Sequence, residues 1–280
     1  MHSNHISLLD VLGRATMCEL YGISSDSSTI INEFLNDFYS HSFNHRHGWG
    51  LAIWNAFVSK TKVVKEEIAA VNSEQLKQIL STPIYGTMAI AHVRNATVGT
   101  VTAENAHPFA GEDISGIQWI LAHNGSILEK SPIDEFKANA AGETDSECIL
   151  LYLIAEMNAA IKEKSVQLQS SQTMLTMRER AEVIEKMTVL LSRNNKLNLM
   201  ISDGKYLYIH VNMKNTLFTY WRDGRRIFST TPLNRFTHSW ETVPLQKLLV
   251  YQAGQLKYTG KNQSSEYISP MLLIDMNYAI

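Results

Sequence analysis

The chain has 280 residues, enough for one large domain with its own hydrophobic core or for two small ones. Its 45% hydrophobic and 19% charged residues are typical of a globular protein and exclude a disordered chain. Lys plus Arg number 25 against 27 Asp plus Glu, so the formal charge is −2 and there is no basic excess to attract polyanions. We therefore expect neither nucleic acid nor a membrane among its partners.

The sequence contains no signal for export or for membrane insertion. The longest uninterrupted apolar run, Cys148 to Ala155, is far shorter than the roughly 20 residues needed to cross a bilayer. Residues 1–16 lack the basic start, long apolar centre and cleavage site of a secretory signal. Two cysteines, Cys18 and Cys148, do not indicate an oxidising compartment. We expect a soluble cytoplasmic protein with reduced thiols.

The first half of the chain contains short runs rich in β-branched and aromatic residues, which predict strands. The predicted strands are residues 18–24, 49–58, 60–65, 85–93 and 117–122. Apolar and polar residues do not alternate in 88–91 and 119–122, which is typical of strands covered on both faces.

Two helices are predicted in the middle of the chain. Thr144 and Glu147 form a capping-box pattern, and residues 148–156 continue that helix with apolar side chains on most of its surface. In residues 177–191 apolar side chains recur every three or four positions, as in an amphipathic helix. The Ser- and Gln-rich residues 165–173 are predicted to be an exposed connection.

Strands are predicted again after Asn198, with hairpin turns at Asp203-Gly204 and Asp223-Gly224. Strands, two helices and further strands, in this order, predict a layered α+β protein with antiparallel sheets between helical layers. We find no G-x-G-x-x-G or G-x-x-x-x-G-K-[ST] pattern, which argues against dinucleotide and P-loop chemistry.

Cys18 taken alone is most simply a small buried hydrophobic residue at the start of a strand. The preceding Met17 favours another interpretation. If translation began at Met17 and that methionine were removed, Cys18 would carry a free α-amine with a pKa of about 7.7–8.0. An amine in that range can act as the general base for its own thiol, so nucleophile and base would be one residue.

Three further polar clusters each have a structural and a chemical interpretation. Arg94 could form an ion pair or hold a carboxylate in its fork. Asn124-Gly125 could form a turn or supply two N–H donors to an oxyanion. Asp145 could favour the positive end of a helix or bind an ammonium group. Together with a thiol, the chemical interpretations describe a pocket for an α-amino acid attacked at its side-chain carbonyl, and glutamine is the obvious candidate.

The chain contains six short motifs that resemble those of the class II glutamine amidotransferases and occur in the same order along the sequence. The resemblance is greatest to the stand-alone branch of that family, which has no fused synthase. The motifs are Met17-Cys18-Glu19-Leu20-Tyr21-Gly22-Ile23, His47-Gly48-Trp49-Gly50, Ala91-His92-Val93-Arg94, Asn105-Ala106-His107-Pro108-Phe109, Ala122-His123-Asn124-Gly125 and Thr144-Asp145-Ser146-Glu147. The resemblance implies the Ntn-hydrolase fold, a four-layer αββα sandwich with two antiparallel sheets. It also implies that residues 18–280 form the amidotransferase domain and that residues 1–17 are a leader or a misassigned start.

The resemblance assigns a role to each motif and implies no metal and no organic cofactor. The implied roles are nucleophile for Cys18, oxyanion donors for Asn124 and Gly125, substrate carboxylate binding for Arg94 with Thr97, α-amino binding for Asp145, and pocket wall for Gly48, Trp49 and His107.

The implied reaction is hydrolysis of the glutamine side-chain amide through a γ-glutamyl thioester on Cys18. The ammonia released would go to an unknown acceptor or to a synthase partner. Two alternatives remain at this point. The substrate could be another γ-glutamyl compound, such as one resembling glutathione, or the chain could be a catalytically silent binding protein in which the leader blocks Cys18.

Overall fold

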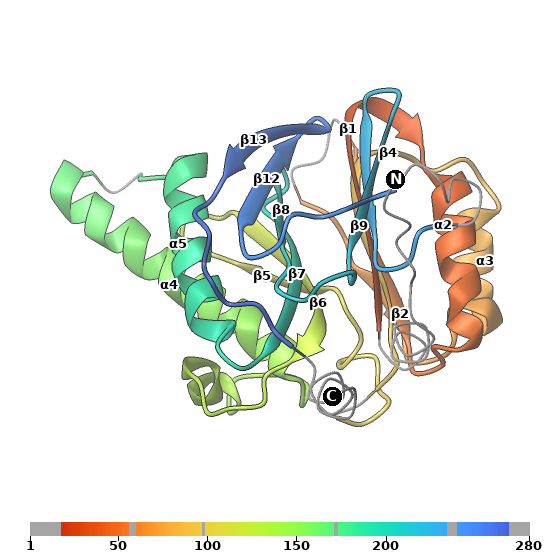
Figure 1. Cartoon of the computed structure of the whole chain (residues 1–280), viewed down its shortest axis with the longest axis horizontal. Helices are drawn as coiled ribbons and strands as arrows, with labels where there is room; N and C mark the ends of the chain where they lie inside the picture. The colour runs from red at the N-terminus through yellow and green to blue at the C-terminus, as the bar shows by residue number, and fades with distance from the viewer. Residues whose placement is uncertain (1–17, 56–59, 97–98, 171–172, 234–239, 269–280) are drawn as a thin grey trace, which may run out of the picture.

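The computed structural model describes residues 18–55, 60–96, 99–170, 173–233 and 240–268, and its strands form two antiparallel sheets (Figure 1). The seven-stranded sheet has the order β11-β9-β10-β1-β4-β2-β3, and the six-stranded sheet has the order β13-β12-β8-β7-β6-β5. The strands of the first sheet are β1 (Glu19–Ile30), β2 (Trp49–Trp54), β3 (Val64–Glu66), β4 (Tyr85–Val93), β9 (Phe218–Arg222), β10 (Arg225–Ser229) and β11 (Glu241–Thr242). Those of the second are β5 (Phe109–Glu112), β6 (Gln118–Ser126), β7 (Lys196–Ser202), β8 (Leu207–His210), β12 (Leu248–Gln252) and β13 (Gln255–Thr259).

Helices cover the outer face of each sheet. The first sheet is covered by α2 (Asn32–Ser40) and α3 (Glu74–Leu80), and the second by α4 (Asp145–Leu168) and α5 (Met177–Leu191), as Figure 1 shows. Three short 3₁₀ helices complete the described elements: η1 (His41–Phe43), η2 (Ala70–Asn72) and η3 (Pro132–Phe136). The predicted four-layer αββα sandwich is confirmed.

Three hydrophobic layers explain why the central strands do not alternate apolar and polar residues. One layer packs α4 and α5 against the second sheet, another packs α2 and α3 against the first, and a third fills the space between the sheets. Adjacent residues of β6 belong to different layers, since Leu121 faces the helices and Ile120 faces the other sheet. Within the described ranges, no helix is both long and apolar enough to cross a bilayer.

The structure corrects several predicted boundaries: β1 continues to Ile30 and β6 to Ser126, and β2 ends at Trp54, with residues 56–58 of the predicted strand 49–58 outside the described residues. Two further corrections have a local cause. Of the predicted strand 60–65 only Val64 and Lys65 pair with β2, because the backbone N–H and carbonyl of Thr61 bond instead to the side-chain amide of Gln118. The predicted connection 165–173 begins later, because α4 continues to Leu168 and ends where Gln169 takes a left-handed conformation (φ 50°).

Both predicted helix starts are present, with different caps. Thr144 Oγ1 accepts a hydrogen bond from the Glu147 N–H, but the Glu147 carboxylate binds the N–H groups of Ala141 and Gly142 rather than closing the predicted capping box. The second helix does have a capping box, between Thr176 and Glu179. The predicted hairpin turns are confirmed, and Asp223 and Gly224 form the β9–β10 turn with φ values of 49° and 75°.

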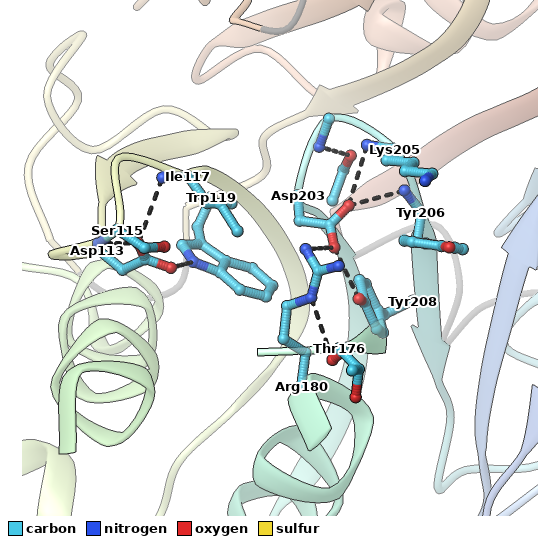
Figure 2. Close-up of polar contacts among 12 residues, drawn as sticks. Asp113, Ser115, Ile117, Trp119, Thr176, Arg180, Asp203, Lys205, Tyr206 and Tyr208 are labelled. Carbon is cyan, nitrogen blue, oxygen red and sulfur yellow. Dashed lines mark hydrogen bonds and ion pairs between the residues drawn. The ribbon is translucent and has the colours of Figure 1, made fainter. Parts of the chain in front are cut away.

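A buried ion pair attaches α5 to the β7–β8 hairpin (Figure 2). Arg180 Nη1 lies 2.7 Å from Asp203 Oδ2, and the two side chains are 11% and 0% exposed. The Asp203 carboxylate also accepts hydrogen bonds from the Tyr208 hydroxyl at 2.7 Å and from the Lys205 and Tyr206 N–H groups at 3.0 and 2.7 Å. The Asp203 carboxylate is therefore fully desolvated, and these partners supply the positive charge and the hydrogen bonds that water would otherwise provide.

Removing the cation of this pair should be costly. We expect Arg180→Met to lower the free energy of unfolding by about 3 kcal/mol, because Asp203 would stay buried without its counter-charge. Urea unfolding followed by circular dichroism measures the change. Arg178→Met on the same helix is the matched control, since its pair with Glu182 is exposed (75% and 52%) and should contribute less than about 1 kcal/mol. Equal effects of the two substitutions would contradict the prediction.

Candidate active site

The neighbouring ends of β1 and β4 bring a thiol and a guanidinium together. Cys18 directly precedes β1, and Arg94 directly follows β4. The two strands pair antiparallel with Glu19 opposite Val93, so the start of one strand lies beside the end of the other. As a result, Cys18 and Arg94 line the same pocket.

The second sheet and α4 complete the pocket. Asn124 and Gly125 lie within β6, paired with Asn198 and Leu197 of β7, so the turn interpretation of the Asn-Gly pair is wrong. The local turn preference of this dipeptide is overridden by strand pairing. Gly125 lines the pocket together with Asp145, the first residue of α4. Two sheets and a helix start therefore converge on Cys18.

The Cys18 thiol is held against the backbone of Asn95. The Asn95 N–H donates to Cys18 Sγ at 3.2 Å, and the Asn95 carbonyl oxygen lies 3.4 Å from the same sulfur. Burial raises the pKa of the Cys18 thiol, while the Asn95 hydrogen bond and the charges of Arg94 and Lys196 act in the opposite direction. Because the raised pKa leaves the thiol protonated near neutral pH, a base must remove its proton before it can attack.

The Asn124 side-chain amide is bound at both ends. Its Nδ2 donates to the main-chain carbonyl of Cys18 at 2.6 Å, and its Oδ1 accepts from Lys196 Nζ at 3.2 Å. Lys196 is only 6% exposed, and burial lowers its pKa to about 8. These partners fix the amide with its nitrogen toward Cys18.

A network of loop contacts holds Arg94. Its Nη1 donates to the Thr100 carbonyl at 2.9 Å. The Thr100 N–H in turn donates to the Glu143 carboxylate at 2.8 Å, and Asn105 Oδ1 accepts from the Glu143 N–H at 2.7 Å. These bonds tie residues 99–105 to the segment that precedes α4. The Arg94 guanidinium, on a residue that is 3% exposed, is thereby positioned in the pocket wall.

Asp145 and His123 are linked through Ser146. Asp145 Oδ2 accepts from the Ile127 N–H at 2.8 Å, and its Oδ1 accepts from Ser146 Oγ at 3.2 Å. His123 Nδ1 lies 3.0 Å from the same Ser146 Oγ, and its Nε2 donates to the Lys196 carbonyl at 3.3 Å. Burial lowers the pKa of His123, so the ring is neutral near pH 7 although the Asp145 charge opposes the shift. Asp145 is thus the anionic group of this side of the pocket.

His107, expected in the pocket wall, lines the pocket and contacts a second buried histidine. His107 Nδ1 lies 2.8 Å from His92 Nε2. Burial lowers the pKa of both rings well below the usual range, which keeps the pair neutral. Among the described residues, no three His, Cys, Asp or Glu side chains come together to hold a metal ion.

The other residues expected at the site are placed differently. Gly48 accepts a hydrogen bond from the Arg94 N–H at 2.8 Å, so it supports the segment that carries the guanidinium. Trp49 is fully buried in the core beneath α2, where it packs on Tyr39 and donates to Glu66 at 3.0 Å. Gly48, Trp49 and Asn124 are not among the residues that line the pocket, although Asn124 contacts Cys18, which does line it. Thr97 lies outside the described residues.

Sequence reasoning missed three residues at the site. Lys196 contacts Asn124, Asn95 contacts the thiol, and Ser146 joins Asp145 to His123. A lysine before an apolar strand is ordinary in sequence, so nothing marked Lys196. Asn95 and Ser146 each stand beside a residue that was identified, and that adjacency was the only available signal.

The chain is similar to known proteins in sequence and in fold. A family model described as "Glutamine amidotransferases class-II" matches residues 17–224. A "Putative glutamine amidotransferase" of Haemophilus influenzae is 27% identical over 210 residues, covering 74% of this chain and 67% of that protein. The "Putative glutamine amidotransferase YafJ" of Escherichia coli is 27% identical over 194 residues, covering 68% of this chain and 71% of that protein.

A solved structure shares the fold. The glutamine phosphoribosylpyrophosphate amidotransferase of B. subtilis superposes with a TM-score of 0.62 at 17% identity, over 89% of this chain and 50% of that chain. The sandwich described above therefore corresponds to about half of that longer protein.

Substitution of Gly125 should disturb both the fold and the pocket. A Cβ atom there would lie 1.9 Å from the Lys196 carbonyl oxygen and 2.4 Å from His123 Nε2, so backbone would have to move. We expect Gly125→Ala to lower the free energy of unfolding by about 1–3 kcal/mol. Urea unfolding measures this loss.

Gly111→Ala in the adjacent strand β5 is the matched control. Its Cβ would lie 2.5 Å from Ile154 Cδ1 and in ordinary contact with Leu150 Cδ2 at 3.8 Å, and the end of a flexible side chain such as Ile154 can move aside. A loss for Gly111→Ala as large as that for Gly125→Ala would show that the β7 carbonyl is not the cause.

Proposed function

Because the chain belongs to the class II glutamine amidotransferases, we propose that it hydrolyses the side-chain amide of glutamine in the pocket beside Cys18. The observation that carries the proposal is the convergence of a thiol, a guanidinium, a carboxylate and a backbone glycine on one pocket. The thiol supplies a nucleophile, and the two opposite charges complement the α-carboxylate and α-ammonium groups of an amino acid.

The proposed nucleophile is Cys18 with a free α-amine. While residues 1–17 are attached, the nitrogen of Cys18 is an amide, which cannot take up a proton. We propose that the active form begins at Cys18, after a start at Met17 and removal of that methionine. The raised pKa of the thiol supports this requirement, because a protonated thiol needs a base close to it.

In the proposed reaction the α-amine takes the Cys18 thiol proton, and Sγ forms a bond to the side-chain carbonyl carbon of glutamine. Asn124 Nδ2 and the Gly125 N–H stabilise the oxyanion that develops. The C–N bond then breaks, and ammonia leaves with the proton from the α-ammonium group. Water hydrolyses the remaining γ-glutamyl thioester to glutamate and free Cys18. An acceptor enzyme would use the ammonia.

The proposed substrate contacts follow the charges of the pocket. Arg94 and Thr97 would hold the α-carboxylate, and Asp145 would bind the α-ammonium group. His107 would contribute to the wall. A primary amide has two N–H donors, so Asn124 can keep one on the Cys18 carbonyl and direct the other to the substrate.

Glutamate release from a panel of γ-glutamyl amides, with ammonia release measured for glutamine, tests the proposal. Protein made from a start at Met17 should release ammonia from glutamine, and Cys18→Ala in the same chain should release none. Intact-mass measurement checks that the chain begins at Cys18. Cys148→Ala is the matched control, since that residue of α4 is buried against the second sheet and does not line the pocket.

The outcomes separate the alternatives. Turnover only of amides with a larger leaving group would replace glutamine by another γ-glutamyl compound. No turnover of any amide by protein that begins at Cys18 would contradict the enzyme proposal and leave a binding protein.

Arg94 and Asn124 should affect different kinetic constants. We expect Arg94→Ala to raise KM by about 10–100-fold, because the substrate carboxylate loses a charge-assisted contact in both ground and transition states. Asn124→Ala should lower kcat by about 10²–10³-fold with little change in KM, as expected for an oxyanion donor. Steady-state kinetics measures both constants. An unchanged kcat in Asn124→Ala would remove its assignment.

A further inference from the structure

Lys196 is a buried cation whose presence the proposed reaction does not yet explain. It is 6% exposed, it begins β7, and it lies opposite Ser126 of β6. Asn124 is two residues before Ser126, and residues two apart on a strand point to the same face, so Lys196 and Asn124 are diagonal neighbours. The Lys196 ammonium reaches along this face to Asn124 Oδ1 at 3.2 Å.

The main chain of Lys196 contacts His123 and Gly125, two residues that line the pocket. Its carbonyl accepts from His123 Nε2 at 3.3 Å and occupies the space where a side chain at Gly125 would begin. The lysine is therefore held between Gly125 and Asn124, the two proposed oxyanion donors. Burying an ammonium group costs free energy, and for this reason most lysines lie at the surface. The burial of Lys196 therefore calls for a specific role.

We propose that Lys196 is a positioning residue of the amidase reaction, which acts by bonding Asn124 Oδ1 and thereby holding the Asn124 nitrogen toward Cys18. This inference rests on the proposed function. With Lys196 present, both ends of the amide have a partner, and a flipped amide would place Oδ1 against the Cys18 carbonyl oxygen and Nδ2 against an ammonium. Without it, Oδ1 is deprived of this bond and the amide is less well oriented.

The cation also strengthens the donor that it orients. The positive charge of the ammonium group beside Oδ1 draws electron density from the Asn124 amide nitrogen. The Nδ2 hydrogens therefore become better donors to a developing oxyanion. Lys196 itself need not touch the substrate for this effect. Its contribution should therefore appear in kcat and should depend on Asn124.

Kinetics of protein beginning at Cys18 tests the proposal. We expect Lys196→Met to lower kcat about 10–100-fold, with KM changed by less than about 3-fold. Lys196→Arg, which keeps a cationic donor, should retain more activity than Lys196→Met. Lys196 also lowers the pKa of the Cys18 thiol directly, but because its main route is through Asn124, the double variant Lys196→Met/Asn124→Ala should be slowed by much less than the product of the two single effects. Lys164→Met is the matched control, since it removes an ion pair with Glu179 on the helical layer.

Each other kinetic outcome overturns the proposal. An unchanged kcat in Lys196→Met means that the lysine is not needed. A rise in KM alone means that it binds substrate. Effects of the two single substitutions that multiply in the double variant mean that Lys196 acts independently of Asn124.

A second measurement does not depend on turnover. The side-chain ¹⁵N–H₂ signal of Asn124, identified by its absence in Asn124→Ala, should move in Lys196→Met if the lysine bonds Oδ1. An unmoved signal overturns the inference even in an active enzyme. If the parent releases no ammonia, the proposed function fails, and this signal still decides whether Lys196 orients the amide.

Discussion

A hydrogen bond between the two sheets sets the geometry of the pocket. Asn124 Nδ2 of the six-stranded sheet donates to the carbonyl of Cys18, which directly precedes β1 of the seven-stranded sheet. Most of the contact between the sheets is an apolar layer, which resists compression but does not define the position of individual polar groups. A directional bond at the edge of that layer fixes where the sulfur lies relative to Gly125. The contacts of Lys196, Arg94 and Asp145 are arranged around this junction.

The charges of the pocket follow from burial. The rings of His92, His107 and His123 are kept neutral by desolvation, whereas Arg94 and Lys196 bring positive charge close to Cys18. Positive charge stabilises an anionic sulfur or oxyanion, but it does not remove a proton. The chemistry therefore still needs a base, and the lowered pKa values of His92, His107 and His123 make these rings weak ones. This is the physical reason for assigning proton transfer to the amine of Cys18.

The sequence predicted the layered fold because local patterns and tertiary structure agreed in the central strands and in the last two helices. Uninterrupted apolar runs indicated β4 and β6, and three-and-four spacing indicated α5. The helices α2 and α3 were missed, because they are short and their apolar residues stand close to the strand runs. The end of β6 was also missed, since Asn124-Gly125 prefers a turn locally and only pairing with β7 makes it a strand.

Motif order identified Cys18, Arg94, Gly125 and Asp145 as neighbours, and all four line one pocket. It could not find Lys196, whose importance depends on a cross-strand diagonal that becomes visible only once the strand register is known. Trp49 was expected in the pocket wall, yet its indole ring lies in the layer beneath α2. Alternate residues of a strand face opposite sides, so a motif places a residue near a site without saying on which side it lies.

The pairing of β1 with β10 separates the two ends of the sandwich. Tyr21 pairs with Ser229 and Ser25 with Arg225, so the Asp223-Gly224 turn lies near the far end of the pairing, away from Cys18. Ser25 lies seven residues after Cys18 along an extended chain, a span of about 23 Å. The Asp223 side chain is 71% exposed. A fluorophore or surface linker attached there would leave the reactive end of the molecule open to solution, so the protein could be immobilised while its thiol chemistry is followed.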